Sequence, residues 1–290
     1  MDQRSPAVSK VTVPVILERK LRGEKITCLT AYDYSSARLV DEADIDMILV
    51  GDSLAQVVLG YDSTVPVTVE EILHHVKAVR RAVRRSLLIA DLPYGAYHVD
   101  DEQTLASAIR FLKEGGAEAV KLEGGRVRAQ RVRKLVQAEI PVVGHIGLTP
   151  QSVHAMGGYR VQGRTLDSAT ELLADAEALE EAGAFAVVLE GIPRELAALI
   201  TRRLRIPTIG IGAGPECDGQ VLVLHDLLGL SFQPAAKFVR HYANLRETIH
   251  GALTRFRADV AQGSYPADHE SYHWPPEVCR QFEKETTRST

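Results

Sequence analysis

Short apolar segments alternate with longer amphipathic segments along most of the chain. The apolar segments are rich in Val, Ile and Leu and close to continuously hydrophobic, which is typical of parallel strands that are buried on both faces. They lie at 26–33, 46–52, 86–93, 119–125, 141–148, 186–191, 207–212 and 222–229. This pattern predicts a parallel sheet built from eight strands.

The segments between these strands have the periodicity of amphipathic helices, as in VEEILHHVKAVRRAVRR and DSATELLADAEALEEAG. Several end on glycine before the next strand, for example at Gly115–Gly116 and at Gly183, as helices often do. Strands that alternate with helices indicate the α/β class. We expect a closed (β/α)8 barrel, or TIM barrel; an open doubly wound sheet is the alternative.

The two ends of the chain differ from this repeating middle. Residues 11–22 predict an N-terminal helix that closes the bottom of the barrel, and residues 235–263 predict one long charged helix. The last residues are rich in Pro, aromatic and charged residues, which indicates a helical or extended tail that is partly disordered. We therefore expect a flexible N-terminus (1–10), a barrel catalytic domain (11–266) and a C-terminal tail (267–290).

Composition and charge exclude several classes of protein. The chain has 290 residues, a net charge of -4 and a pI of about 6.2, which argue against nucleic acid or an anionic membrane as a partner. It has no apolar stretch long enough for a transmembrane helix and no apolar core of a signal peptide. The three cysteines are far apart in no metal-binding pattern, which favours reduced thiols and a cytoplasmic location.

Carboxylates follow three successive predicted strands. Asp52, Asp91 and Glu123 stand where these strands end, which is where TIM barrels carry their catalytic groups. A single carboxylate at such a position is often only a helix cap or half of a salt bridge. Three on adjacent strands repel one another, and a bound cation relieves that repulsion. Oxygen ligands alone favour a hard ion, Mg²⁺ above all.

Further polar residues are expected at the same rim. Lys121 is two positions before Glu123 and therefore on the same face of its strand. His145 lies in the fifth strand and Glu190 ends the sixth, where GAFAVVLEG echoes GAEAVKLEG of the fourth. We interpret Lys121 as holding a substrate carboxylate, Glu190 as a general base, and His145 as a donor to a substrate oxygen or an orienting group for Lys121.

Each of these residues also has a competing interpretation. Lys121 could be a Schiff-base nucleophile, or only a counter-ion for Glu123. Glu190 could be a rim residue paired with an arginine, and His145 a satisfied core histidine. The Gly-rich segment GIGAGPECDGQ (210–220) could bind phosphate or could only form a tight turn.

Several segments resemble the ketopantoate hydroxymethyltransferase (3-methyl-2-oxobutanoate hydroxymethyltransferase) family. VGDSL, GHIGLTPQSV and GGYRVQGR are specific in combination, and the resemblance extends from about residue 11 to 266. It implies a (β/α)8 barrel of the phosphoenolpyruvate/pyruvate-binding type, a homodecamer and the use of Mg²⁺. It also implies hydroxymethyl transfer from 5,10-methylenetetrahydrofolate to 3-methyl-2-oxobutanoate, which gives 2-dehydropantoate for pantothenate and coenzyme A biosynthesis.

The resemblance also assigns roles to residues. The family's metal ligands fall on Asp52, Asp91 and Glu123, and its proton acceptor falls on Glu190. Its substrate contacts fall on Asp52, Ser53, Asp91 and Lys121. All of these positions except Ser53 had already been selected as polar residues at the strand ends. His145 is a substrate-binding candidate from its strand position.

Two departures from the family pattern are visible. The chain continues past SYPADHESYHW, and GLSFQPAAKFVRHY matches the family only loosely. Two other functions remain as alternatives. One is a metal-dependent lyase or mutase acting on phosphoenolpyruvate or another 2-oxo acid, and the other is a non-catalytic barrel.

Overall fold

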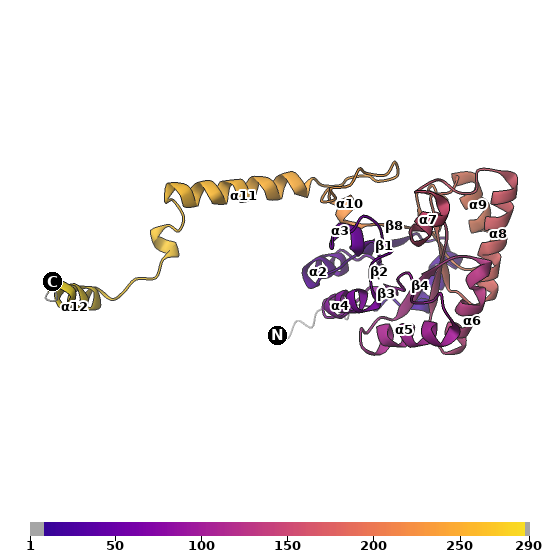
Figure 1. Cartoon of the computed structure of the whole chain (residues 1–290), viewed down its shortest axis with the longest axis horizontal. Coiled ribbons are helices and arrows are strands. Elements are labelled where there is room, and N and C mark those ends of the chain that lie inside the picture. The colour runs from indigo at the N-terminus through magenta and orange to yellow at the C-terminus, as the bar shows by residue number, and fades with distance from the viewer. Residues whose placement is uncertain (1–8, 288–290) are drawn as a thin grey trace. The chain divides into compact units, whose positions relative to one another are not determined.

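The computed structural model describes residues 9–287 and contains a closed barrel of parallel strands (Figure 1). Each strand pairs with the next one along the chain, and β8 pairs with β1 to close the barrel. The strands are β1 (Ile26–Thr30), β2 (Met47–Val50), β3 (Leu87–Asp91), β4 (Ala119–Glu123), β5 (Val142–Gly147), β6 (Ala186–Glu190), β7 (Thr208–Ile211) and β8 (Gly219–Leu222). The predicted (β/α)8 barrel is confirmed, and the open sheet is wrong because β1 and β8 are hydrogen-bonded.

Helices connect consecutive strands from β1 to β7 and surround the barrel, whereas a short loop joins β7 to β8 (Figure 1). The α-helices are α1 (Val13–Arg22), α2 (Tyr34–Glu42), α3 (Leu54–Val57), α4 (Val69–Arg80), α5 (Asp101–Lys113), α6 (Ala129–Gln137), α7 (Val153–Met156), α8 (Leu166–Glu181), α9 (Arg194–Arg203), α10 (Leu224–Leu227), α11 (Leu245–Gln262) and α12 (Pro276–Thr287). Short 3₁₀ helices are η1 (Arg126–Arg128), η2 (Pro150–Ser152) and η3 (Asp268–Glu270). Within residues 9–287, no helix is both long and apolar enough to cross a membrane.

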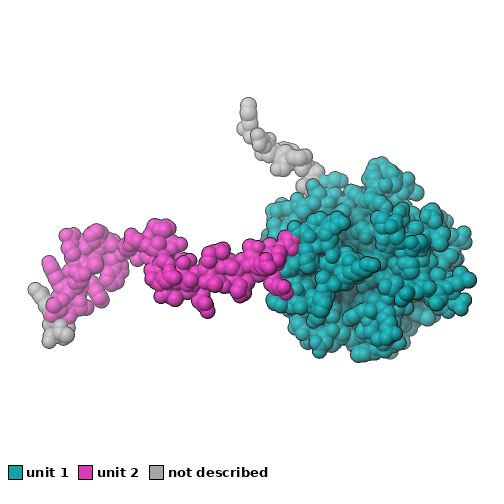
Figure 2. Space-filling model, turned by 90° about the horizontal axis from the view of Figure 1, so that it is seen from above, with its two compact units in different colours: residues 1–242 teal, residues 243–290 magenta. Residues whose placement is uncertain are grey.

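The chain divides into two compact units, which Figure 2 colours separately. The first ends at Tyr242 and contains the barrel; the second begins at Ala243 and contains α11 and α12, neither of which has a buried residue. The expected parts 1–10, 11–266 and 267–290 remain a proposal. Residues 1–8 and 288–290 of that division lie outside the described residues.

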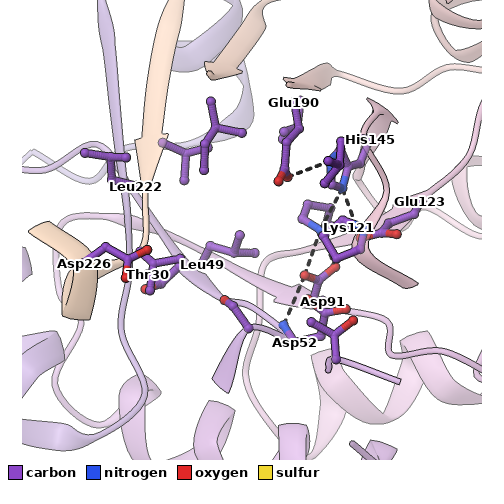
Figure 3. A pocket seen from close by; sticks show the side chains of 18 of the residues that line it. Thr30, Leu49, Asp52, Asp91, Lys121, Glu123, His145, Glu190, Leu222 and Asp226 are labelled. Carbon is purple, nitrogen blue, oxygen red and sulfur yellow. Dashed lines mark hydrogen bonds and ion pairs between the residues drawn. The ribbon is translucent and has the colours of Figure 1, made fainter. Parts of the chain in front are cut away.

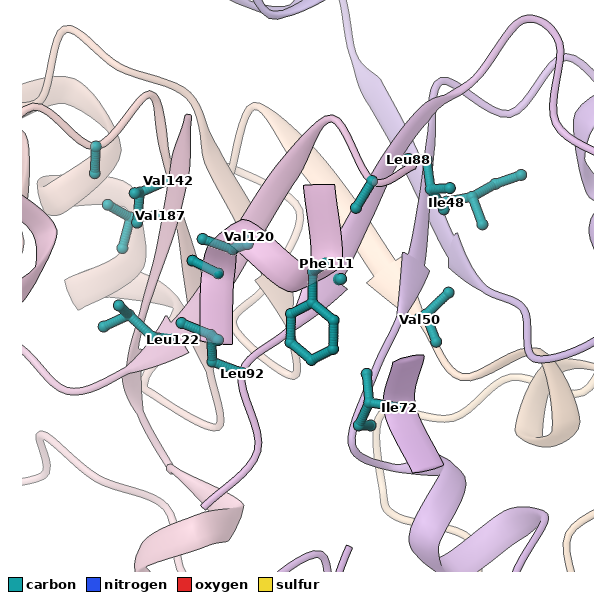
Figure 4. Close-up of a cluster of buried hydrophobic side chains, with 14 of the residues drawn as sticks. Ile48, Val50, Ile72, Leu88, Leu92, Phe111, Val120, Leu122, Val142 and Val187 are labelled. Atoms are coloured by element: carbon teal, nitrogen blue, oxygen red, sulfur yellow. The ribbon is translucent and has the colours of Figure 1, made fainter. Parts of the chain in front are cut away.

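Alternation along the strands separates two layers of apolar side chains. One side chain in two points into the barrel, where Met47, Leu49 and Ile89 pack together. The others point outward and pack against the helices, as Ile48 and Val50 do (Figure 4). Burial on both faces explains why these strands have continuously hydrophobic sequences.

Helix α1 closes the lower end of the barrel. Its residue Ile16 joins the inner apolar cluster and is fully buried. Ion pairs fix the helix there, because Arg19 lies 2.9 Å from Asp46 and Lys20 lies 2.8 Å from Asp218. The predicted N-terminal helix is confirmed, and the carboxyl ends of the strands remain open at the opposite end.

The last strand lies earlier in the sequence than predicted. We predicted it at 222–229, but β8 covers Gly219–Leu222, and the residues that follow form α10. Gly219 pairs with Ile26, where an added Cβ would lie only 2.5 Å from the Ile26 carbonyl oxygen. The strand therefore begins at Gly219, where the two backbones can approach closely, and not in the more apolar segment 222–229.

The predicted helix at 235–263 is also shorter than expected, because α11 begins only at Leu245. Residues 235–244 are irregular, and Phe238 packs on Gly212. A Cβ at Gly212 would lie 2.5 Å from the Phe238 ring. Packing of this aromatic ring against β7 keeps the segment out of the helix and at the mouth of the barrel.

Candidate active site

The predicted site residues surround one cavity of about 270 Å³. Asp91, Lys121, Glu123, His145 and Glu190 come from the carboxyl ends of β3 to β6 and gather on one side of it (Figure 3). Asp52 and Ser53 join them from the turn after β2. The structure therefore brings all seven candidates together.

Strand register explains which of these residues are neighbours. Asp91 is in register with Lys121, Glu123 with His145, and Gly147 with Glu190. Since adjacent strands lie about 4.8 Å apart, inward side chains at these heights touch across the strands.

Lys121 forms a buried ion pair with Asp91. Its Nζ lies 2.7 Å from each of the two Asp91 carboxylate oxygens. Burial by itself would lower the pKa of Lys121, but nearby carboxylates, first that of Asp91, outweigh burial and raise it. Lys121 is therefore not simply a counter-ion of Glu123.

The carboxylates of the cavity are closely packed and poorly solvated. Burial, followed by repulsion from Asp91 and Glu123, raises the pKa of Asp52 well above its usual value. Burial also raises the pKa of Asp91, which Lys121 offsets only in part. Burial would raise the pKa of Glu123, but His145 and then Lys121 lower it below its usual value.

These side chains form hydrogen bonds and ion pairs with one another and do not point toward one common position. Within residues 9–287, no three His, Cys, Asp or Glu side chains converge on a point where they could hold a metal ion. Glu123 Oε1 is buried, and its partner is the His145 ring, whose Nδ1 lies 3.3 Å away.

His145 lies between two carboxylates. Its Nδ1 is 3.3 Å from Glu123 Oε1 and its Nε2 is 3.1 Å from Glu190 Oε2. Burial and then Lys121 act to lower the pKa of His145, but Glu123 and Glu190 raise it to about 9. His145 also lies 3.5 Å from Lys121 Nζ. Glu190 thus contacts a histidine, not the arginine of the alternative interpretation.

Sequence reasoning missed three residues that support this cluster. Tyr32 shares a 2.8 Å hydrogen bond with the Ser53 hydroxyl. Gln151, in η2, donates to Asp52 and accepts from the Tyr97 hydroxyl. The only available signal was that Gln151 lies in the GHIGLTPQSV segment, where it follows the fifth strand.

The opposite side of the cavity carries apolar side chains, with Thr30 and Asp226 among them. Leu49 and Leu222 lie away from the ionic cluster (Figure 3). The apolar residues that line the cavity are Leu49, Leu148, Val188, Ile211, Val221, Leu222, Val223, Ala236 and Phe238. The Gly-rich segment 210–220 begins in β7, where Ile211 lines the cavity, and its Gly212 lies against the Phe238 ring.

Comparison with known proteins places this site in a family. A family model described as ketopantoate hydroxymethyltransferase matches residues 10–268. The chain belongs to the ketopantoate hydroxymethyltransferase family. The resemblance seen in the sequence is thereby confirmed.

Relatives within this family are similar over almost their whole length. The 3-methyl-2-oxobutanoate hydroxymethyltransferase of Koribacter versatilis (strain Ellin345) is 64% identical over 93% of this chain and 92% of its own. The protein of the same name from Carboxydothermus hydrogenoformans is 55% identical over 95% of this chain and 100% of its own. The chain is therefore an enzyme, a hydroxymethyltransferase.

Similar solved structures have the same fold at low sequence identity. A phosphonopyruvate hydrolase in complex with oxalate and Mg²⁺ has a TM-score of 0.59 at 13% identity and covers 96% of both chains. A 2,3-dimethylmalate lyase of the PEP mutase/isocitrate lyase superfamily has a TM-score of 0.57 at 17% identity and covers 96% of this chain and 97% of its own. These structures share the barrel fold with this chain, and at this identity the likeness extends to the fold alone.

Proposed function

We propose that the enzyme transfers a hydroxymethyl group to 3-methyl-2-oxobutanoate from 5,10-methylenetetrahydrofolate. One water is consumed, and the products are 2-dehydropantoate and tetrahydrofolate. A new C–C bond forms at C3 of the oxo acid as its C3 proton is lost. Family membership supports the acceptor, and through it a place in pantothenate synthesis.

The observation that carries this proposal is the two-sided cavity. An oxo acid of this kind has a carboxylate and a keto oxygen at one end and an isopropyl group at the other. The ionic cluster around Lys121 suits the charged end, and the apolar side with Leu49 and Leu222 suits the isopropyl group. In this orientation C3 lies between the two sides, within reach of a rim carboxylate.

Lys121 provides the fixed positive charge. Both carboxylate oxygens of Asp91 contact its ammonium group and fix its position. Little reorganisation energy is therefore needed to place this charge when the reaction occurs. We assign Lys121 to the substrate carboxylate or to the oxygen on which enolate charge develops. Ser53, held by Tyr32, and His145 then orient the substrate oxygens.

Glu190 is our candidate for the base that removes the C3 proton. Its side chain is 16% exposed, which makes it the most accessible carboxylate of the cluster. His145 Nε2, 3.1 Å away, fixes one Glu190 oxygen and leaves the other for the proton. Loss of this proton gives the enolate that attacks the one-carbon unit.

Asp52, Asp91 and Glu123 fit a divalent cation, for which Mg²⁺ is our proposal. The raised pKa of Asp52, caused by burial and by the neighbouring carboxylates Asp91 and Glu123, indicates an unmet need for positive charge beside these three side chains. To reach a common point, Asp91 would have to turn from Lys121 and Glu123 Oε1 from His145. When bound, such an ion supplies Lewis-acid stabilisation of developing negative charge.

Two further expectations are part of this proposal. They are a homodecamer, which the resemblance implies, and a cytoplasmic location, which the cysteine pattern favours. Measurement of the mass of the native particle tests the first, and fractionation of cells that produce the protein tests the second.

Glu190→Gln tests the proton transfer. Without folate, the wild-type enzyme should exchange the C3 proton of 3-methyl-2-oxobutanoate in deuterated water, as followed by proton NMR. Because the amide cannot accept this proton, we expect exchange to fall about 10²–10⁴-fold. Glu195→Gln, the same change on the exposed start of α9, should exchange at the wild-type rate. Wild-type exchange by Glu190→Gln would remove Glu190 from this role.

A further inference from the structure

Gln151 is a buried amide whose hydrogen-bonding groups are engaged by the protein itself. Its side chain is on η2, and the residue is 3% exposed. Nε2 donates to Asp52 Oδ2 at 2.8 Å and to the Leu92 carbonyl at 3.0 Å. Oε1 accepts from the Tyr97 hydroxyl at 2.6 Å. Both amide hydrogens are thereby used.

The same residue also reaches a second carboxylate. Its backbone N–H donates to Glu123 Oε2 at 3.0 Å. The Tyr97 hydroxyl, which donates to Gln151, accepts from the Glu123 backbone N–H at 3.2 Å. Gln151 and Tyr97 therefore connect the turn after β2, the end of β3 and the end of β4, the three places that carry the acidic trio.

We propose that Gln151 is a positioning residue for the metal carboxylates. It fixes one oxygen of Asp52 and one of Glu123, so that the other oxygen of each remains for a divalent cation. In the described chain, Gln151 engages Asp52 through Oδ2 and Glu123 through Oε2, and the partner of Glu123 Oε1 is the His145 ring at 3.3 Å. This inference rests on the proposed function, because it requires the cation site.

Two simpler roles for Gln151 fit these contacts less well. A substrate ligand needs a free donor, and neither hydrogen of this amide is free. A purely structural glutamine would stabilise the fold without affecting metal affinity. Partners of metal ligands usually do affect it, since their loss lowers metal affinity or activity about 10–100-fold.

The test is direct metal binding by Gln151→Leu, measured on the purified full-length chain after removal of metal. Titration with Mn²⁺ followed by electron paramagnetic resonance, and with Mg²⁺ by calorimetry, gives Kd without reference to turnover. We expect Kd to rise about 10–100-fold. At saturating metal, kcat should recover toward the wild-type value, because no reacting group has been removed.

Gln151→Glu and Tyr97→Phe refine the result. The glutamate keeps the shape of the side chain but cannot donate to Asp52, so we expect a rise in Kd similar to that of the leucine variant. Tyr97→Phe removes one hydroxyl from the network and should raise Kd by a smaller factor. It also keeps the inference testable if Gln151→Leu does not fold.

Thr201→Val is the matched control. It removes a buried hydroxyl that hydrogen-bonds the Thr208 hydroxyl at 2.7 Å, and neither residue lines the cavity. It should lower thermal stability and leave metal Kd unchanged. If Gln151→Leu binds metal with the wild-type Kd while Asp52→Asn no longer binds metal, the inference about Gln151 is overturned and the proposed cation site stands. Absence of metal binding by the wild-type enzyme would overturn both the inference and the cation site of the proposed function.

Discussion

Lys121 carries a buried positive charge within the upper part of the barrel. Two interpretations of it remained open in the sequence, an electrostatic role and a Schiff-base nucleophile. A nucleophilic lysine must be unprotonated and free to reach a carbonyl carbon. Lys121 is instead an ammonium group held by both oxygens of Asp91. This geometry favours the electrostatic role.

Borohydride trapping separates the two roles. With 3-methyl-2-oxobutanoate and sodium borohydride, we expect intact-mass spectrometry to show no covalent adduct on the wild-type enzyme. Lys121→Met should lower kcat about 10²–10³-fold, because a charge that stabilises the transition state is lost. A reduced adduct that maps to Lys121 would contradict this assignment.

Residue positions could be predicted where they follow from strand geometry. Asp91, Lys121 and Glu123 were found because period-two alternation and the end of a parallel strand fix both the face and the height of a side chain. Gln151 could not be found in this way. Its contacts depend on how the loop after β5 folds back over β3 and β4, which no local pattern specifies.

Among the elements, the link between α4 and β3 is held by a carboxylate from α2. Asp41 accepts hydrogen bonds from the backbone N–H groups of Arg84, Arg85 and Ser86, at 2.9, 3.0 and 2.7 Å. Burial would raise the pKa of Asp41, but these backbone hydrogen bonds outweigh it and hold the pKa below its usual value. The ionised form thus stabilises the fold.

Asp41→Asn should lower the free energy of unfolding by about 1–3 kcal/mol near neutral pH, as measured by denaturant titration. Because the pKa of Asp41 is lower in the folded state, its contribution is complete above the unfolded value and is lost as pH falls through the folded value. The difference between variant and wild type should therefore narrow only below about pH 4. A difference that is constant between pH 7 and pH 3.5 would show that ionisation of Asp41 is irrelevant.

Element boundaries were predictable where burial alone decides them. The first seven strands lie within their predicted segments because those segments are largely apolar. The eighth was misplaced since its position depends on the approach of Gly219 to Ile26, a contact between the last and the first strand that are far apart in the sequence. The start of α11 likewise depends on where Phe238 packs.

At the scale of the whole molecule, the second unit contains no buried residue in either of its α-helices. The family match also ends at residue 268, before α12 begins. We expect a chain shortened to residues 1–268 to melt within about 1–2 °C of the full chain, because exposed residues contribute little to stability. Its kcat should be unchanged.

Differential scanning calorimetry and steady-state kinetics on the two chains check this expectation. A chain of residues 1–275 serves as the control, since it removes α12 and keeps η3. A large fall in melting temperature would show that the exposed helix α12 packs against another copy of the chain.

Closure of the barrel joins β1 to β8, and so pairs Ile26 with Gly219. Hydrogen bonds between such distant positions cannot form until β8 has been made, and the ribosome releases β1 long before that. The early strands then present apolar edges and faces to the cell until synthesis reaches the last strand. Parallel sheets with long-range contacts fold slowly and expose such surfaces to aggregation. The newly made chain is consequently most dependent on chaperones in the interval before β8 emerges.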